Sequence, residues 1–145
     1  MENPNTSITV ETTVKETVER IWKLWTTPID ISKWNNPSED WHSPRVEIDL
    51  RNGGMFFYRM ETKDGSSGFD HSGKYDKVIT YELIEYTGSD GRKSIIKFIS
   101  NGDETTVIET FETETETPLD IQKEFCQAIL NNFKQYAENE KQLRI

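Results

Sequence analysis

Two hydrophobic periods divide this chain: an alternating period typical of β-strands, and a three-to-four-residue period typical of helices. Alternation begins at residues 8–14, where Ile8, Val10 and Val14 share one face. Further alternating segments predict strands over about residues 45–50, 55–61, 69–76, 77–87, 93–99 and 104–115. The short turns between them, such as residues 51–54 (RNGG) and 101–102 (NG), are typical of β-hairpins, so we expect an antiparallel meander.

Helical periodicity is strongest over residues 118–143, a long amphipathic segment. Its apolar face holds Ile121, Phe125, Ala128, Ile129, Phe133 and Tyr136. Pro118 suits the first turn of this helix, and Thr117 is the expected N-cap. Two shorter helices are predicted nearer the N-terminus. One runs from about residue 17 to just before Pro28, and the other covers residues 29–34 with Thr27 as its N-cap.

A long amphipathic helix that follows many strands can cover the concave side of a curved sheet. We therefore predict an α+β helix-grip fold, in which a curved antiparallel sheet of six to seven strands wraps around the long C-terminal helix. Two short helices should follow the first strand. The length of 145 residues fits a single domain spanning residues 1–145. Such an arrangement usually leaves an apolar cavity between sheet and helix, which is a common type of small-molecule site.

Composition and net charge limit the classes of partner that this chain is expected to bind. The net charge is −9 without a basic cluster, which argues against binding to nucleic acid or to an anionic membrane surface. No apolar run is long enough for membrane insertion, and the N-terminal residues are polar, so we expect a cytoplasmic protein. The single cysteine, Cys126, excludes an intramolecular disulfide and is expected to be an inert buried thiol.

Catalytic motifs are absent from the sequence, including the nucleophile elbow, the Walker loop and the glycine-rich dinucleotide motif. The two histidines, His42 and His71, are too few and too isolated in sequence for a convincing zinc site. We therefore predict neither a metal nor a cofactor.

Seven short motifs, in this order, resemble one protein family. They are residues 21–28 (IWKLWTTP), 33–35 (KWN), 40–44 (DWHSP), 49–54 (DLRNGG), 58–61 (YRME), 68–70 (GFD) and 127–133 (QAILNNF). Across residues 8–138 the chain resembles a stand-alone member of the activator-of-heat-shock-protein-ATPase homologue family. That family lies within the START-like helix-grip (SRPBCC) superfamily, which includes polyketide cyclases.

The resemblance implies a helix-grip fold with a hydrophobic cavity, but no single reaction. Members of the superfamily bind lipids, sterols, polyketides or plant hormones, and some catalyse cyclisation. The eukaryotic co-chaperones carry an additional chaperone-binding domain, which we do not expect in a chain of this length. The family often has Gly-Trp in place of Phe125-Cys126 and Phe in place of His71. The cavity should therefore differ from those of its relatives in shape and polarity.

Alternation and helical position select the residues expected to line the cavity. They are Trp25, Trp41, Phe56, Tyr58, Phe69, His71, Tyr75, Phe98, Glu109, Phe111, Phe125, Cys126, Ile129 and Phe133. His71 should point inward, where it could act as a general base, orient a polar group of a ligand, or be a core histidine satisfied by a neighbour.

Glu109 shares its predicted face with Val107 and Phe111. A buried carboxylate is costly unless it is paired, so the expected partner is Arg59, Tyr75 or His71. A β-bulge could instead turn Glu109 outward. Structural pairing is favoured over catalysis for this residue.

The loop expected at residues 35–44 carries Trp41 and His42, which could cover the mouth of the cavity. Asp49 and Arg51 flank the next turn and are expected to stabilise it through hydrogen bonds and an ion pair.

The function predicted from the sequence is binding of a hydrophobic or aromatic small molecule, lipid-like or polyketide-like, with no assigned reaction. Binding is favoured over enzymatic activity because catalytic motifs are missing. Two alternatives remain: a cyclase or hydrolase that uses His71 or Glu109 as its acid–base group, and a chaperone-interacting module. No protein partner is identified.

Overall fold

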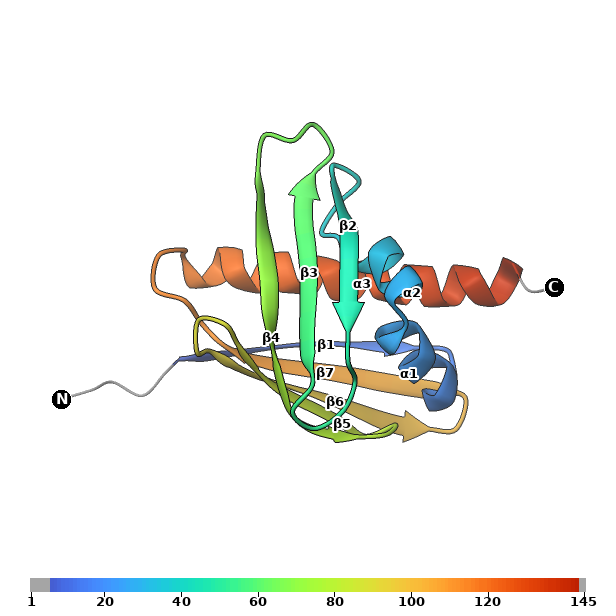
Figure 1. Ribbon diagram of the computed structural model, residues 1–145. Coiled ribbons are helices and arrows are strands. Elements are labelled where there is room, and N and C mark those ends of the chain that lie inside the picture. Colours follow the sequence, from blue (N-terminus) through green and yellow to red (C-terminus); the bar gives the residue numbers. More distant parts are fainter. Residues whose placement is uncertain (1–5, 144–145) are drawn as a thin grey trace.

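A strongly curled seven-stranded antiparallel sheet and a long helix dominate the computed structural model, which describes residues 6–143, with side chains described through residue 139 (Figure 1). In chain order the elements are β1 (Ser7–Val14), α1 (Val18–Thr26), α2 (Pro28–Trp34), β2 (Trp41–Ile48), β3 (Met55–Thr62), β4 (Gly68–Ile79), β5 (Leu83–Gly88), β6 (Lys93–Asn101), β7 (Glu104–Glu112) and α3 (Leu119–Leu143). The strand order is β1-β7-β6-β5-β4-β3-β2. This architecture confirms the predicted α+β helix-grip fold.

The first strand returns to the last one, since β1 pairs with β7 along its whole length. Two threonine pairs on the outer face reinforce this pairing, because the hydroxyl groups of Thr9 and Thr110, and those of Thr13 and Thr106, lie 2.9 Å apart. On the inner face Val10 and Val14 are buried, as the alternation predicted. The meander from β2 to β7 therefore ends beside β1.

Irregularities in β2 and β4 accompany the curl of the sheet. The register shifts between His42 and Arg45 in β2 and between Tyr75 and Lys77 in β4, and such bulges increase strand twist. At Gly73 a β-carbon would collide with the Thr87 carbonyl and would lie 2.9 Å from the Phe56 ring, so glycine permits this close packing. In Figure 1 strands β2 to β4 consequently stand steeply across β1, β6 and β7.

Polar bonds along one side attach α3 to β1 and α2. The Gln127 side-chain amide donates to the Glu11 carbonyl (3.1 Å), and the Lys134 ammonium donates to the Thr13 carbonyl (2.6 Å). On the α2 side the Asn132 amide donates to the Trp34 carbonyl (2.8 Å). All three donors lie in the part of α3 that begins at Gln127, so the polar attachment is concentrated toward its C-terminal end.

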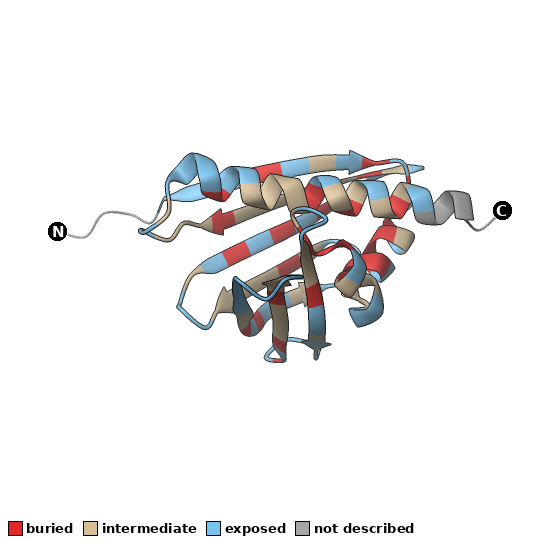
Figure 2. Ribbon diagram, turned by 90° about the horizontal axis from the view of Figure 1, so that it is seen from above, coloured by how far each residue is buried: buried red, intermediate tan, exposed pale blue. Residues whose placement is uncertain are grey.

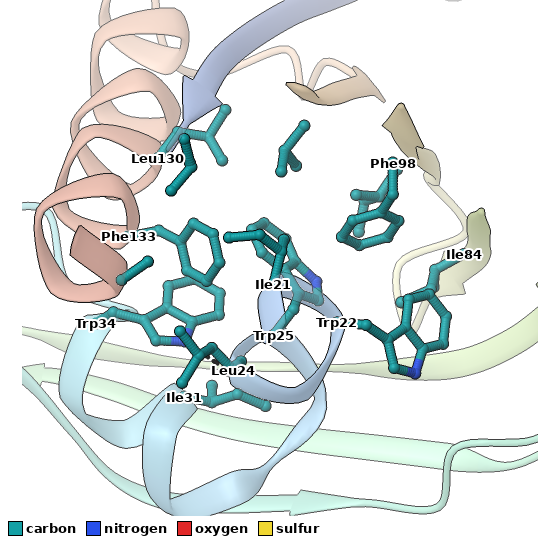
Figure 3. Close-up of a cluster of buried hydrophobic side chains, with 14 of the residues drawn as sticks. Ile21, Trp22, Leu24, Trp25, Ile31, Trp34, Ile84, Phe98, Leu130 and Phe133 are labelled. Atoms are coloured by element: carbon teal, nitrogen blue, oxygen red, sulfur yellow. Dashed lines mark hydrogen bonds between the residues drawn. The ribbon is translucent and has the colours of Figure 1, made fainter. Parts of the chain in front are cut away.

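The core fills the space between α1, α2 and the C-terminal half of α3 (Figure 3). The rings of Trp25, Trp34 and Phe133 pack together with centroids 4.6 to 5.0 Å apart. The Trp34 indole N–H donates to the Leu24 carbonyl (2.9 Å), so this buried polar group is satisfied. Leu130 and Ile31 are completely buried beside these rings.

Four boundaries differ from the prediction. The single strand expected over residues 77–87 is in fact the end of β4 and the whole of β5, joined by a turn in which Tyr81 has φ = 68°. A positive φ at tyrosine is uncommon, and no Gly or Asn marks this turn in the sequence. Strand β2 begins at Trp41, inside the expected loop, because pairing with β3 resumes beyond the bulge.

At the other end of the chain, β7 stops at Glu112 and α3 begins at Leu119. The Pro118 carbonyl accepts the amides of Ile121 and Gln122 at 3.1 Å each, so Pro118 rather than Thr117 occupies the N-cap position. No helix in the described part of the chain is long and apolar enough to cross a membrane.

Candidate functional site

A cavity of about 500 Å³ lies between the concave face of strands β3 to β7 and the N-terminal half of α3. Aromatic and aliphatic side chains contribute much of its wall. The predicted residues found on this wall are Trp25, Phe56, Tyr58, Phe69, His71, Tyr75, Glu109, Phe111, Phe125, Cys126 and Ile129. They come from α1, from the three strands β3, β4 and β7, and from α3, and only the folded chain brings them together.

Three predicted wall residues lie elsewhere. Phe98 packs edge-on against Trp22 at 5.2 Å, and Phe133 is fully buried between Trp25 and Trp34, so both belong to the filled core. Helical periodicity identified Phe133 as inward-facing but could not separate packed core from cavity wall.

Trp41 lies at the rim. Its ring is 6.0 Å from those of Phe69 and Phe125, which are 6.2 Å from each other. These three residues come from β2, β4 and α3. They form an aromatic bridge from the sheet to the helix beside the cavity.

His71 and Tyr86 form a polar pair on the cavity wall, with the Tyr86 hydroxyl 3.3 Å from His71 Nε2. Burial, reinforced by the positive charge of Arg92, lowers the pKa of His71 to about 4. The imidazole is therefore neutral at pH 7 and a weak base. Burial also raises the pKa of Tyr75 to about 12 and that of Tyr86 well above its usual value, so both hydroxyls stay protonated.

Glu109 is a titratable group of β7 that lines the cavity. Its strand β7 keeps an unbroken register with both β1 and β6, so no bulge turns the side chain outward. Burial raises the pKa of its carboxyl group to about 7. Burial raises the pKa values of Tyr58, Tyr86 and Cys126, and the charge of Glu109 raises them further; all four residues line the same cavity.

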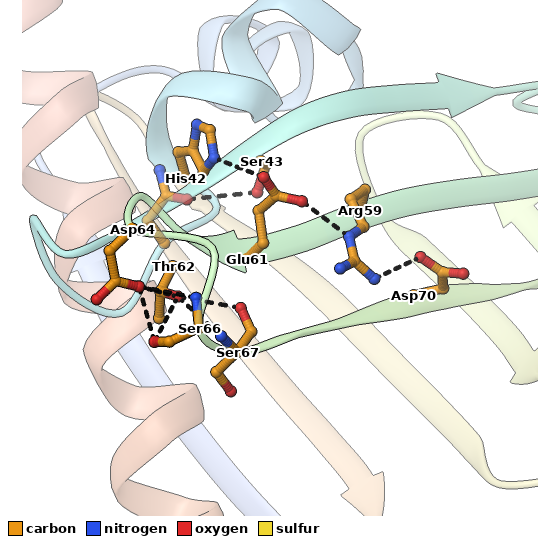
Figure 4. A network of polar contacts seen from close by, with 10 residues as sticks. His42, Ser43, Arg59, Glu61, Thr62, Asp64, Ser66, Ser67 and Asp70 are labelled. Atoms are coloured by element: carbon orange, nitrogen blue, oxygen red, sulfur yellow. Dashed lines mark hydrogen bonds and ion pairs between the residues drawn. The ribbon is translucent and has the colours of Figure 1, made fainter.

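The expected partners of Glu109 are not found. Arg59 lies on the outer face of the sheet, where its guanidinium bonds Glu61 (3.0 Å) and Asp70 (3.1 Å) (Figure 4). Among the described residues, neither Tyr75 nor His71 nor any other side chain forms a hydrogen bond or ion pair with the Glu109 carboxyl group. The described residues therefore do not supply the partner that the predicted structural pairing requires.

His42 also belongs to the outer network rather than to the cavity. Its Nε2 lies 3.1 Å from a Glu61 carboxylate oxygen, on the strand pair β2–β3 (Figure 4). Asp49 and Arg51 form the expected ion pair at 2.8 Å beside the turn, where Gly53 adopts φ = 84°. These polar groups support the β2–β4 hairpins from outside.

Several wall residues were missed by sequence reasoning. Ile84 and Tyr86 of β5 and Ser94 and Ile96 of β6 face the cavity. The alternation of Ile84 and Tyr86 would have shown their shared face had the β4–β5 turn been recognised. Arg92, in the β5–β6 turn, carried no such signal because only the curl of the sheet brings that turn toward the start of α3.

Comparison with known proteins identifies the family. The sequence pattern described as "Activator of Hsp90 ATPase homolog 1-like protein" matches residues 15–138. The chain belongs to this family. The match spans nearly all of the described residues, from the end of β1 to the last turns of α3.

Solved structures agree with this assignment. The chain is similar to Chr148 from Cytophaga hutchinsonii (47% identity, TM-score 0.80) and to the AHSA1-like protein from Aeromonas hydrophila (36% identity, TM-score 0.87), and each comparison covers 94% of both chains. The protein NE0264 from Nitrosomonas europaea has the same fold at 17% identity, with a TM-score of 0.79 over 97% of this chain and 99% of that one. No curated protein is significantly similar in sequence. These comparisons establish the family and the START-like fold, which together suggest a ligand-binding domain.

Proposed function

We propose that this chain is a single-domain cytoplasmic protein that binds a hydrophobic or aromatic small molecule between the sheet and α3. The supporting observation is the cavity itself, whose volume of about 500 Å³ lies in the usual range for small-molecule sites. Aromatic rings supply apolar surface, and burial of apolar ligand surface contributes about 25 cal/mol per Å². His71, Tyr86 and Glu109 are the polar groups that would orient a ligand.

An amide-resolved NMR titration tests this proposal. The purified protein is titrated with a panel of lipids, flavonoids and polyketide-like aromatics. We expect shifts to cluster at His71, Tyr75, Phe111 and residues 125–133. Shifts confined to the outer face would contradict the proposed site.

Substitution of Ile129 tests whether the ligand binds in this cavity. Ile129→Trp should fill the cavity and abolish binding while the fold survives, because Ile129 lies on the wall. Ile99→Trp makes the same change at a half-exposed position on β6 outside the wall and should leave binding intact. Unchanged binding by a folded Ile129→Trp protein would rule out this placement.

Catalysis is the second candidate function, and Glu109 is the observation that favours it. A carboxyl group with a pKa of about 7 in an apolar cavity is suited to proton transfer near neutral pH, whereas neutral His71 is a poor base. A cyclase or hydrolase activity should then be lost in Glu109→Gln while binding of a neutral ligand remains. Turnover that is unaffected by this substitution would exclude Glu109 from the chemistry.

The family name raises a third activity, stimulation of the Hsp90 ATPase. A chaperone-interacting module would bind Hsp90 through its surface, and Ile129→Trp would not weaken that complex. Pull-down with purified Hsp90, compared between wild type and Ile129→Trp, separates this activity from ligand binding.

A further inference from the structure

Glu109 presents a carboxyl group to an otherwise mainly apolar interior. It forms no hydrogen bond or ion pair with the described residues, although the hydroxyls of Tyr58 and Tyr86 are near enough for its charge to act on them. Burial of an ionised group without a partner is unfavourable. A cationic group on a bound ligand would satisfy this carboxylate.

The charge of the cavity wall favours a cationic ligand. Glu109, Asp90, Glu112 and Glu114 contribute to it, whereas the carboxylate of Asp70, which also borders the cavity, bonds Arg59 on the outer face at 3.1 Å. Among the described residues, Arg92 is the one Lys or Arg on the wall, and its Nε donates to Asp90 at 2.6 Å. With a net charge of −9 for the whole chain, this wall attracts cations and repels carboxylate ligands such as fatty acids.

Aromatic rings beside Glu109 add a second feature suited to a cation. The Phe56 ring packs against Tyr58 at 5.5 Å and against Tyr86 at 4.9 Å, and all three line the cavity. An ammonium group gains energy over an aromatic face, and more so away from water. A carboxylate in a cavity with several aromatic rings thus suits the ammonium group of an amine, while the remaining wall suits an apolar body.

We propose that the ligand is an apolar or aromatic amine whose ammonium group binds the Glu109 carboxylate. This inference rests on the proposed ligand-binding function and narrows it to one chemical class. Fatty acids and neutral hydrophobic compounds of the same shape bind more weakly, because neither offers a cation to Glu109.

Three probes with one skeleton test the inference: 4-phenylbutylamine, 4-phenylbutan-1-ol and 4-phenylbutanoic acid. Their dissociation constants are measured by NMR titration at pH 8, where both Glu109 and the acid probe are ionised. We expect the amine to bind at least about tenfold more tightly than the alcohol, the range of a hydrogen bond to a charged group, and the acid to bind most weakly.

The variant Glu109→Gln keeps the shape of the side chain and removes its charge. It should reduce the preference for amine over alcohol to about twofold or less, while affinity for the alcohol changes little. Glu11→Gln is the matched control, because it removes the same charge from an exposed position on the neighbouring strand β1 and should keep the preference. If Glu109→Gln fails to fold, the ranking of the three probes by the wild type decides the inference.

The possible results distinguish a failure of amine recognition from a failure of the proposed ligand binding in the cavity. Equal binding of amine and alcohol, a preference for the acid, or a preference that survives in Glu109→Gln overturns amine recognition. If Ile129→Trp still abolishes that binding, the cavity remains the site. If neither these probes nor any compound of the wider panel binds, both proposals are overturned.

Discussion

The two halves of α3 meet different interiors. From its middle toward the C-terminal end, α3 buries Leu130, Phe133 and Ala137 completely against the aromatic core from α1 and α2. In the N-terminal half the side chains facing the sheet, Phe125 and Ile129, keep accessible surface because they border the cavity. Figure 2 shows the buried positions concentrated toward the C-terminal half.

The difference follows from what lies opposite the helix. Trp25 and Trp34 reach α3 from the two short helices and fill the space beside Phe133. Beyond them the sheet curls away, and side chains of strands β3 to β6 do not fill the gap to α3. A single amphipathic helix therefore serves two purposes. One half anchors the fold, and the other half forms one wall of a cavity.

Truncation of one phenylalanine in each half of α3 should give the largest difference in stability loss between the two halves. Phe133→Ala should lower the free energy of unfolding by about 3–5 kcal/mol, because it leaves a hole in a packed core. Phe125→Ala should cost only about 1 kcal/mol, because the ring is half-exposed at the rim. Urea unfolding of both variants measures this difference. Equal losses would show that the two halves are packed alike.

The pH dependence of stability tests how dry the cavity is around Glu109. In the unfolded chain this carboxyl ionises near its ordinary pKa of 4.5, whereas in the folded protein it ionises only near pH 7. Stability is therefore lost as pH rises from about 4.5 to 7, since the unfolded state releases its proton first. Glu109→Gln does not titrate at this position.

Relative to wild type, Glu109→Gln should thus gain about 3 kcal/mol of stability between about pH 4 and pH 8. His71 also titrates, and its lowered pKa makes stability increase as pH rises. Because His71 is present in both proteins, its contribution cancels when their stabilities are compared. Urea unfolding across this pH range measures the change. A difference between the two proteins that stays constant with pH would mean that water solvates Glu109 fully.

Enlargement of one small side chain in each half of α3 should give the smallest difference in stability between the two halves. Ala137→Leu inserts atoms into the filled half and should cost about 1–3 kcal/mol. Cys126→Leu adds similar bulk at the cavity wall, where space is available, and should change stability by less than about 0.5 kcal/mol. Thermal unfolding compares the pair. A large penalty for Cys126→Leu would indicate that the cavity is closed in solution.

Much of the candidate site followed from local pattern. Alternation placed Phe56, Tyr58 and His71 on one face of their strands because successive side chains of a strand point to opposite sides. The same rule places Arg59 on the outer face, which is why it does not pair with Glu109. Where a turn lacked its usual residues, as at Tyr81, the strand boundary and the inward residue Tyr86 were both missed.

The sequence by itself determined the secondary structure, the fold class and the face to which most side chains point, because these depend on short-range periodicity and turn chemistry. It did not determine which inward residues touch each other. Whether Phe133 meets packed rings and Phe125 meets empty space depends on the curl of the sheet and on where two short helices come to rest. Those distances join residues about a hundred positions apart along the chain, so only the tertiary structure decides them. The isolation of Glu109 inside an aromatic cavity is likewise a property of the assembled fold.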